Sequence, residues 1–307
     1  MQLTTPVDIV PQKRLYNFED TFVLLGSCFS QHIAQKMRQA YINVVENPFG
    51  VQYNPMSIAK CMQWLKSDEL FTEADLVYYD GLYHSMLHHG EFSSVSKEQT
   101  LSNINDTLQK VRQTIRRSKQ VNFVVTFGTA YVYLQDDEVV SNCHKMPALQ
   151  FVRQRLTVGE IVDTWSKIAQ ENHEANFQFT VSPIRHKKDG LHNNQLSKAI
   201  LHLAIEQIGV DYFPAYEIMM DELRDYRFYA EDMLHPSDLA VEYIWQQYKK
   251  QSFTPQAQQQ IEDAEQVWRM QNHVMLHPDT AQAKEFKEKT EQKYKLIKQK
   301  YSWIEKS

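Results

Sequence analysis

The sequence predicts an α/β fold in which helices cover a parallel sheet. Three apolar runs have the length of strands and are rich in Val and Phe, at residues 21–25, 121–127 and 177–181. Such runs are typical of strands that are buried on both faces. Between them lie amphipathic segments with apolar residues at helical spacing, at 30–40, 57–65, 99–118, 158–171 and 194–208. Strands that alternate with helices in this way favour a parallel sheet.

The chain beyond the predicted sheet has a different composition. The 307 residues exceed the size of one small domain, and 42% of them are hydrophobic. From about Thr254 the chain is rich in Gln, Glu and Lys, a helix-favouring mixture that His277-Pro278 interrupts. We therefore expect a main domain at 1–250 and a C-terminal helical extension at 251–307. Aromatic residues in the extension, such as Trp268 and Tyr294, predict that it packs on the body or on a second subunit of a homo-oligomer.

Charge and composition exclude several classes of partner. With 33 basic and 38 acidic residues the chain has no basic excess, so we expect no nucleic acid partner. Residues 1–11 do not resemble a signal peptide, and no apolar stretch is long enough to span a bilayer. Three widely spaced cysteines predict free thiols in a reducing cytoplasm. No glycine-rich nucleotide motif occurs, so we expect no cofactor.

The first predicted strand ends in Gly26-Ser27-Cys28-Phe29, where the chain turns into a helix. In open parallel sheets, ligands bind beyond the carboxyl ends of the strands. A nucleophile on such a turn is held rigidly, and the positive end of the helix favours a thiolate or an oxyanion. We therefore expect the pKa of Cys28 to lie below the value of about 8.5 of a free cysteine. The alternative is that Ser27 caps the helix and Cys28 is a small core residue.

A second motif, Asp232-Met233-Leu234-His235-Pro236, precedes a predicted helix some two hundred residues later. The proline favours an extended conformation for His235. An aspartate three residues earlier can orient the imidazole while its other nitrogen faces a nucleophile. The alternative is that Asp232 caps a turn and His235 is a surface histidine.

Together these two motifs resemble the first and last blocks of the SGNH/GDSL hydrolases. Gly26-Ser27-Cys28-Phe29-Ser30 is similar to the motif that names the GSCFA family, with Ser30 in place of its alanine. Further similar segments extend the resemblance over about residues 20–250, at 47–50, 126–130, 142–145, 182–186 and 221–229. The resemblance implies a flavodoxin-like, three-layer α/β/α fold with acyl-transfer chemistry.

The resemblance also implies roles for individual residues. Alignment on Gly26 places Cys28 at the nucleophilic serine of the Gly-Asp-Ser block, whereas a shift of one residue makes Ser27 the nucleophile. His235 corresponds to the base, and Asp232 orients it. Gly50 is similar to the second-block glycine whose amide holds the oxyanion.

The third block normally supplies an asparagine to the oxyanion hole, but the chain has Ala130 there. We expect Asn142 to replace it. His144, Arg185 and His186 lie in polar clusters next to predicted sheet ends and are candidates for binding an anionic or sugar-bearing substrate. The histidines of 84–89 lie in an aromatic, alternating segment that favours strand or loop over a helical metal motif, so we predict no metal site.

These observations predict an SGNH-like hydrolase or acyltransferase acting on an ester or acyl group, such as a carbohydrate ester, through a Cys/Ser-His-Asp mechanism. One alternative is a non-catalytic carbohydrate-binding or scaffolding protein that keeps the fold. Another is a redox protein that uses Cys28 and Cys143.

Overall fold

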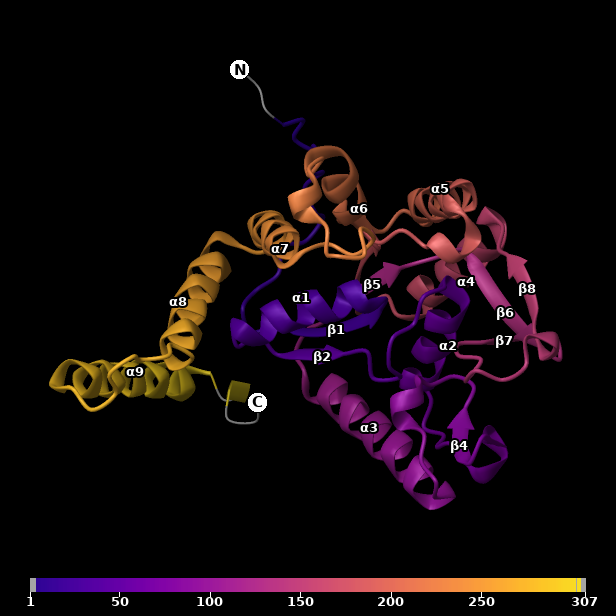
Figure 1. Ribbon diagram of the computed structural model, residues 1–307, viewed down its shortest axis with the longest axis horizontal. Helices are drawn as coiled ribbons and strands as arrows, with labels where there is room; N and C mark the ends of the chain where they lie inside the picture. Colours follow the sequence, from indigo (N-terminus) through magenta and orange to yellow (C-terminus); the bar gives the residue numbers. More distant parts are fainter. Residues whose placement is uncertain (1–3, 302, 305–307) are drawn as a thin grey trace.

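A computed structural model describes residues 4–301 and 303–304 (Figure 1). Its centre is a five-stranded parallel sheet in the order β10-β9-β5-β1-β2. The strands are β1 (Thr21–Gly26), β2 (Val44–Glu46), β5 (Val121–Phe127), β9 (Asn176–Val181) and β10 (Asp211–Tyr212). Two small antiparallel sheets are inserted in the connections: β3 (Leu76–Tyr79) with β4 (Leu82–Ser85), and β6 (Tyr131–Gln135) with β7 (Glu138–Val140) and β8 (Val152–Arg155).

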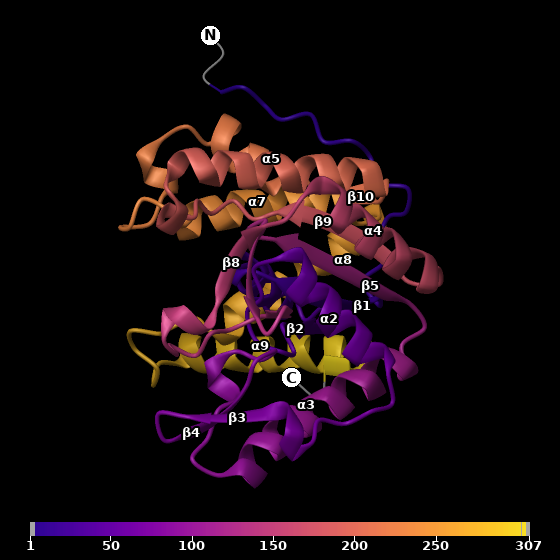
Figure 2. The same cartoon turned by 90° about the vertical axis from the view of Figure 1, so that its right-hand side faces the viewer.

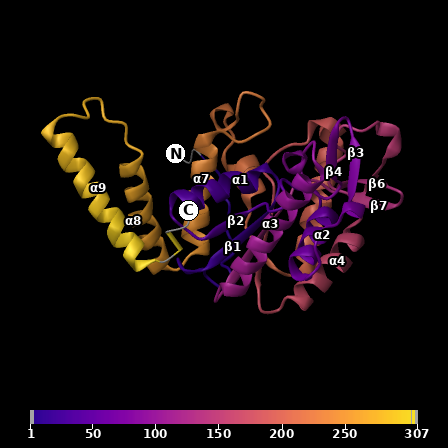
Figure 3. The same cartoon turned by 90° about the horizontal axis from the view of Figure 1, so that it is seen from below.

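Helices cover both faces of the central sheet. They are α1 (Cys28–Gln39), α2 (Pro55–Lys66), α3 (Lys97–Arg117), α4 (Val158–Glu171), α5 (Leu191–Ile208), α6 (Ala215–Glu217) and α7 (Asp238–Ser252). Short turns are η1 (Glu73–Asp75), η2 (Gly90–Phe92), η3 (Ala148–Gln150), η4 (Lys187–Asp189), η5 (Ile218–Glu222) and η6 (Tyr226–Phe228). Figure 3 shows α1 and α7 on one side of β1 and β2, with α2 and α4 on the other.

Strand β1 shows why the chain forms three layers. All of its residues are buried, and successive side chains point to opposite faces. Phe22 and Leu24 join the apolar cluster of α1 and α7. Val23 and Leu25 join the cluster of α2, α3, α4 and α5. The predicted three-layer α/β/α fold is therefore confirmed, and Figure 2 shows the same sheet from the side.

The order of strands changes direction at β1. The chain passes from β1 to β2 on one side and later continues with β5 on the other, so the topology switches between β1 and β5. Ligands bind at such a switch point in open α/β sheets. Gly26 ends β1 there with φ of +145°, and a Cβ atom on it would lie 2.2 Å from the Thr126 carbonyl oxygen. Only glycine allows this close approach of the two strands.

In the described part of the C-terminal extension, α8 (Pro255–Gln271) and α9 (Ala281–Lys300) lie on either side of His277-Pro278. In Figures 1 and 3 they form a hairpin at one end of the molecule. The buried face of α8, which includes Ile261 and Ala264, belongs to the same apolar cluster as α1 and α7. Trp303 Nε1 donates to the Tyr41 carbonyl oxygen at 2.9 Å, which ties the end of the described chain to the body. Among the described residues, no helix has the length and apolar character needed to cross a bilayer.

Candidate active site

The turn from β1 into α1 contains both predicted nucleophiles, in different environments. Ser27 is the N-cap of α1, and its side chain is buried. Its Oγ donates to Ser182 Oγ at 2.9 Å and accepts from the Phe29 amide at 3.3 Å. Cys28 is the first residue of the helix and is only partly buried. The Ser27 hydroxyl is therefore engaged in the structure of the turn, whereas the Cys28 thiol is a free side chain.

The electrostatic environment of Cys28 differs from the sequence-based expectation. Burial raises the pKa of the Cys28 thiol, although the amides of Cys28 and Phe29 lower it. The negative charge of Asp232 raises this pKa further, and the positive charge of Lys198 lowers it. The prediction of a lowered pKa was wrong, because desolvation outweighs the helix N-terminus here.

Asp232 and His235 form a hydrogen-bonded pair in the loop before α7. His235 Nδ1 lies 2.5 Å from Asp232 Oδ2. The Leu234 and His235 amides donate to Asp232 Oδ1 at 2.9 and 3.0 Å. These hydrogen bonds, the two backbone bonds first, lower the pKa of Asp232 to about 2. Because the carboxylate only accepts, Nδ1 is the donor, which leaves Nε2 of a neutral His235 as an acceptor.

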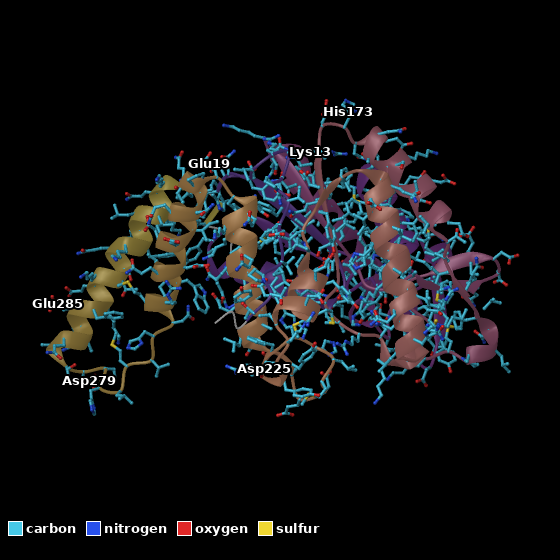
Figure 4. All side chains as sticks on the ribbon, turned by 90° about the horizontal axis from the view of Figure 1, so that it is seen from above. Lys13, Glu19, His173, Asp225, Asp279 and Glu285 are labelled. Atoms are coloured by element: carbon cyan, nitrogen blue, oxygen red, sulfur yellow. The ribbon has the colours of Figure 1, made fainter. Side chains whose placement is uncertain are left out.

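The loop that contains this pair approaches the start of α1. Asp232 acts electrostatically on Cys28, and His235 acts on His32 of α1 and on His186. Figure 4 shows Asp225, in the segment before this loop, at the opposite end of the molecule from His173, which precedes β9. A cavity of about 540 Å³ lies at the His173 end, beside the start of β5. The Cys28 turn, which follows the carboxyl end of β1, lies at the opposite end of the sheet.

Lys198 is a member of this site that the sequence-based interpretation missed. It lies in α5, is 1% exposed, and donates from Nζ to the Gly128 and Ser182 carbonyl oxygens at 2.7 and 2.8 Å. Burial lowers its pKa to about 7. A sequence signal existed, since Lys198 shares the core-facing side of α5 with the buried Asn194, Leu201 and Ile205.

Arg185 and His186, predicted to bind substrate, lie on the loop after β9 at the same edge. The His186 amide donates to Asn194 Oδ1 at 2.9 Å. Its Nε2 is buried beside the Gly128 backbone, and burial lowers the pKa of His186 to about 4. Arg185 instead faces Met220 Sδ and the ring of Tyr229.

Gly50 follows β2, but its amide is engaged. It donates to the Asn47 carbonyl oxygen at 2.7 Å in a tight turn, so in this structure it is not free for an oxyanion. Asn47, not singled out from the sequence, offers a different donor. Its Oδ1 accepts from the Gly26 amide at 2.9 Å, and its Nδ2 is buried without a partner.

Asn142 and His144 belong to a separate polar cluster. His144 Nε2 lies 2.9 Å from the Ser85 carbonyl oxygen, and its amide donates to Asn142 Oδ1. The Asn142 amide donates to the Met86 carbonyl oxygen. Both residues are therefore held against the β3–β4 hairpin, and these contacts do not bring them to Cys28. The histidines of 84–89 lie in β4 and the following loop, as expected, with His84 and His88 bonded to Ser93 and Ser85.

Ala130 occupies the position where the resemblance places an asparagine. It is fully buried among apolar residues, and its amide donates to Ser197 Oγ at 2.8 Å. This side chain packs in the core. Cys28, Cys61 and Cys143 are all free thiols, so Cys28 and Cys143 form no disulfide.

Comparison with known proteins gives one family. The model described as the GSCFA family matches residues 21–248. No curated protein matches the chain. The matched region extends from the start of β1 through the Cys28 turn and the Asp232–His235 loop into α7. Because it covers most of the 307 residues, including every strand of the central sheet, the chain belongs to the GSCFA family.

Proposed function

We propose that this protein is an acyl-ester hydrolase or O-acyltransferase of the SGNH type in which Cys28 is the nucleophile. One observation carries the proposal: the Asp232–His235 pair and the Cys28 turn, some two hundred residues apart, lie within electrostatic reach at the switch point of the sheet. A thiol, an imidazole and an orienting carboxylate are the parts that nucleophilic acyl transfer requires.

In the proposed reaction, His235 Nε2 takes the proton from Cys28 Sγ, and the thiolate attacks the acyl carbonyl carbon. The carbonyl electron pair moves to oxygen and returns when the ester C–O bond breaks. His235 protonates the departing alcohol, which leaves a thioester on Cys28. Water, or a sugar hydroxyl, then gives its proton to His235 and attacks the thioester; the C–S bond breaks, His235 returns the proton to the Cys28 sulfur, and the acid or new ester leaves.

The negative oxygen of the intermediate needs donors that are fixed in advance. The Cys28 amide at the N-terminus of α1 is one candidate. The Nδ2 of Asn47 is the second, because it is buried and unpartnered while Oδ1 is fixed by the Gly26 amide. Asn47 would thereby supply the side-chain donor that Ala130 cannot.

The geometry favours Cys28 over Ser27 as nucleophile. The Ser27 hydroxyl already donates to Ser182 and caps α1, so attack by it would break two structural contacts. The raised pKa of Cys28 means that its thiol needs a base, and His235 is that base in the proposal.

We place the substrate among small-molecule or carbohydrate esters and the reaction in the cytoplasm, where three free thiols persist. Arg185 and His186 at the same edge would contact the polar part of the substrate. A second subunit, if the protein assembles, would use the α8–α9 hairpin.

The test combines turnover with site-specific labelling. A panel of acyl esters is assayed with Cys28→Ala, Ser27→Ala and His235→Ala, and iodoacetamide and fluorophosphonate adducts are located by mass spectrometry. We expect Cys28→Ala to abolish turnover, His235→Ala to lower it by ~10² to 10⁴-fold, and Ser27→Ala to retain most of it. Unchanged turnover in His235→Ala would show that His235 is not the catalytic base. A fluorophosphonate adduct on Ser27 would make Ser27 the nucleophile instead of Cys28. If no ester is turned over and neither residue is labelled faster than an ordinary side chain, the protein is better explained as a binding protein.

A further inference from the structure

Tyr53 is an exposed aromatic residue on a segment that is otherwise fixed. It is 42% exposed, whereas its neighbours Gln52 and Asn54 are 1% and 6% exposed. Gln52 Nε2 donates to the Leu87 carbonyl oxygen at 2.8 Å, and Asn54 Oδ1 accepts from the Ser57 amide at 2.8 Å and caps α2. Because both neighbours are held in the interior, the ring of Tyr53 is presented to solvent on a preorganised backbone.

The same segment crosses the switch point of the sheet. The Gln52 amide donates to the Gly26 carbonyl oxygen at 2.9 Å, at the end of β1 and two residues before the proposed nucleophile. The Tyr53 carbonyl oxygen accepts from the amides of Gly128 and Thr129, which follow β5, at 2.8 and 2.9 Å. These bonds fix Tyr53 at the carboxyl ends of β1 and β5, where open α/β sheets bind their ligands.

His186 reaches the same place from the loop after β9. Its ring and the ring of Tyr53 are nearly perpendicular, at 87°, with their centroids 5.9 Å apart. A Cβ atom on Gly128 would lie 3.0 Å from the Tyr53 carbonyl oxygen and 3.4 Å from His186 Nε2, so a side chain there would crowd both. The two rings therefore form a corner beside the turn that contains the nucleophile.

The chemistry of this corner suits a sugar. Burial lowers the pKa of His186 to about 4 and raises the pKa of Tyr53, so both rings are uncharged at neutral pH. Arg185, the neighbouring cation, faces Met220 Sδ and the ring of Tyr229 instead. An uncharged aromatic face attracts the C–H face of a sugar ring, and polar groups beside it bind the hydroxyls, whereas an anion needs a cation.

We propose that Tyr53 is the platform on which the sugar part of the ester substrate packs, which makes it a specificity-determining residue. The inference rests on the proposed function and narrows its substrate class to esters of a sugar ring. It assigns recognition to the aromatic ring of Tyr53, so a phenylalanine can replace the tyrosine and an aliphatic residue cannot.

The first experiment compares esters that share one acyl group. Acetylated methyl glycosides of glucose, galactose and N-acetylglucosamine are assayed against acetylated glycerol, which has no ring. We expect wild type to prefer a glycoside ester, and Tyr53→Leu to lose about tenfold in kcat/KM for that ester alone, the effect of losing one aromatic contact. Tyr53→Phe should keep the preference. Tyr78→Leu, at an exposed tyrosine of β3, is the matched control and should change neither ester.

Three results would overturn the proposal, with thermal melting used to verify that each variant is folded. The first is an unchanged preference in Tyr53→Leu. The second is an equal loss for both kinds of ester, since Tyr53 would then act on the acyl group or on the reacting atoms. The third is an equal loss in Tyr53→Phe and Tyr53→Leu, because the hydroxyl alone would then be responsible. If Tyr53→Leu does not fold, Tyr53→Gln replaces it.

A second experiment needs no turnover and separates this inference from the proposed function. The unacetylated methyl glycosides are added to the full chain, and alkylation of Cys28 by iodoacetamide is followed by mass spectrometry, with Cys143 as the internal control. A glycoside should slow alkylation of Cys28 in wild type and Tyr53→Phe but not in Tyr53→Leu, and glycerol should not slow it. Such protection without esterase activity keeps the role of Tyr53 and rejects acyl transfer. Ester turnover without protection in wild type keeps acyl transfer and rejects the platform.

Discussion

The carboxamide of Asn47 is held in one orientation, because its Oδ1 accepts a hydrogen bond from the Gly26 amide. Its Nδ2 is buried without a hydrogen-bond partner and is therefore the atom that can donate to an oxyanion. We predict that Asn47→Asp lowers ester turnover by ~10² to 10³-fold, the usual effect of losing one oxyanion donor. The aspartate keeps the oxygen that Gly26 needs, removes the donor and adds a negative charge that repels the oxyanion. The measurement is kcat for the best ester of the panel.

Two controls accompany this variant. Iodoacetamide labelling of Cys28 should persist, because Asn47 acts in the proposal on the oxyanion after attack. Asn142→Asp, in the cluster against the β3–β4 hairpin, should leave kcat nearly unchanged. A large loss of kcat in Asn142→Asp, with no loss in Asn47→Asp, would mean that Asn142 and not Asn47 donates to the oxyanion.

At this scale, the sequence revealed residues whose roles depend on local spacing. Asp232 and His235 are three positions apart, and their hydrogen bond forms within one loop. Asn47 and Lys198 escaped notice because their significance comes from burial beside segments far away in the chain. The predicted direction of the Cys28 pKa shift was wrong for the same reason, since desolvation of the thiol depends on which other elements of the fold bury it.

Helix α8 packs against α7 through a buried polar contact as well as through apolar side chains. Glu265 accepts from Trp245 Nε1 at 2.7 Å and from Lys249 Nζ at 2.9 Å, and the Lys249 and Glu265 side chains are 6% and 12% exposed. We predict that Glu265→Gln lowers the free energy of unfolding by about 3 kcal/mol, because it leaves a buried ammonium without its partner. Urea unfolding followed by circular dichroism measures the change.

The matched control is Asp68→Asn, the same change in the exposed Arg116–Asp68 pair. It should cost less than about 1 kcal/mol. Adding Lys249→Met to Glu265→Gln should restore most of the lost stability. Equal effects of the two single changes would show that burial of the Lys249 pair is unimportant for docking α8.

Longer elements with a regular apolar pattern were the predictable ones. β5 and α4 have the bounds that the sequence predicted, and β1 and β9 differ by a single residue. β2 and β10 have only three and two residues and are partly exposed, so they show no apolar run. The β3–β4 and β6–β8 sheets were likewise missed, because their strands are short and half-exposed.

For the molecule as a whole, Lys198 predicts a pH dependence of stability. Burial lowers its pKa in the folded state from 10.5 to about 7. Between these values the unfolded chain binds a proton that the folded protein does not, so this group makes the free energy of unfolding rise with pH from about 7 to 10. Relative to Lys198→Met, wild type should gain up to several kcal/mol over that window, since one pKa unit corresponds to ~1.4 kcal/mol.

Urea unfolding of wild type and Lys198→Met at several pH values tests this expectation. Lys167→Met, on the exposed side of α4, controls for the loss of a lysine. The difference between wild type and the control should stay constant with pH. A constant difference for Lys198→Met as well would mean that the buried lysine keeps its proton through the window.

The side chains of His235 and Cys28 differ in their exposure to solvent. The His235 side chain is 42% exposed, whereas Cys28 is partly buried and packs against the apolar cluster of α1 and α7. In the proposed reaction, the base that activates the second nucleophile is thus open to water, while the thioester forms on a more covered side chain. Water would then compete with every sugar acceptor, and a sugar that covers the exposed His235 side chain on binding would favour acyl transfer over hydrolysis.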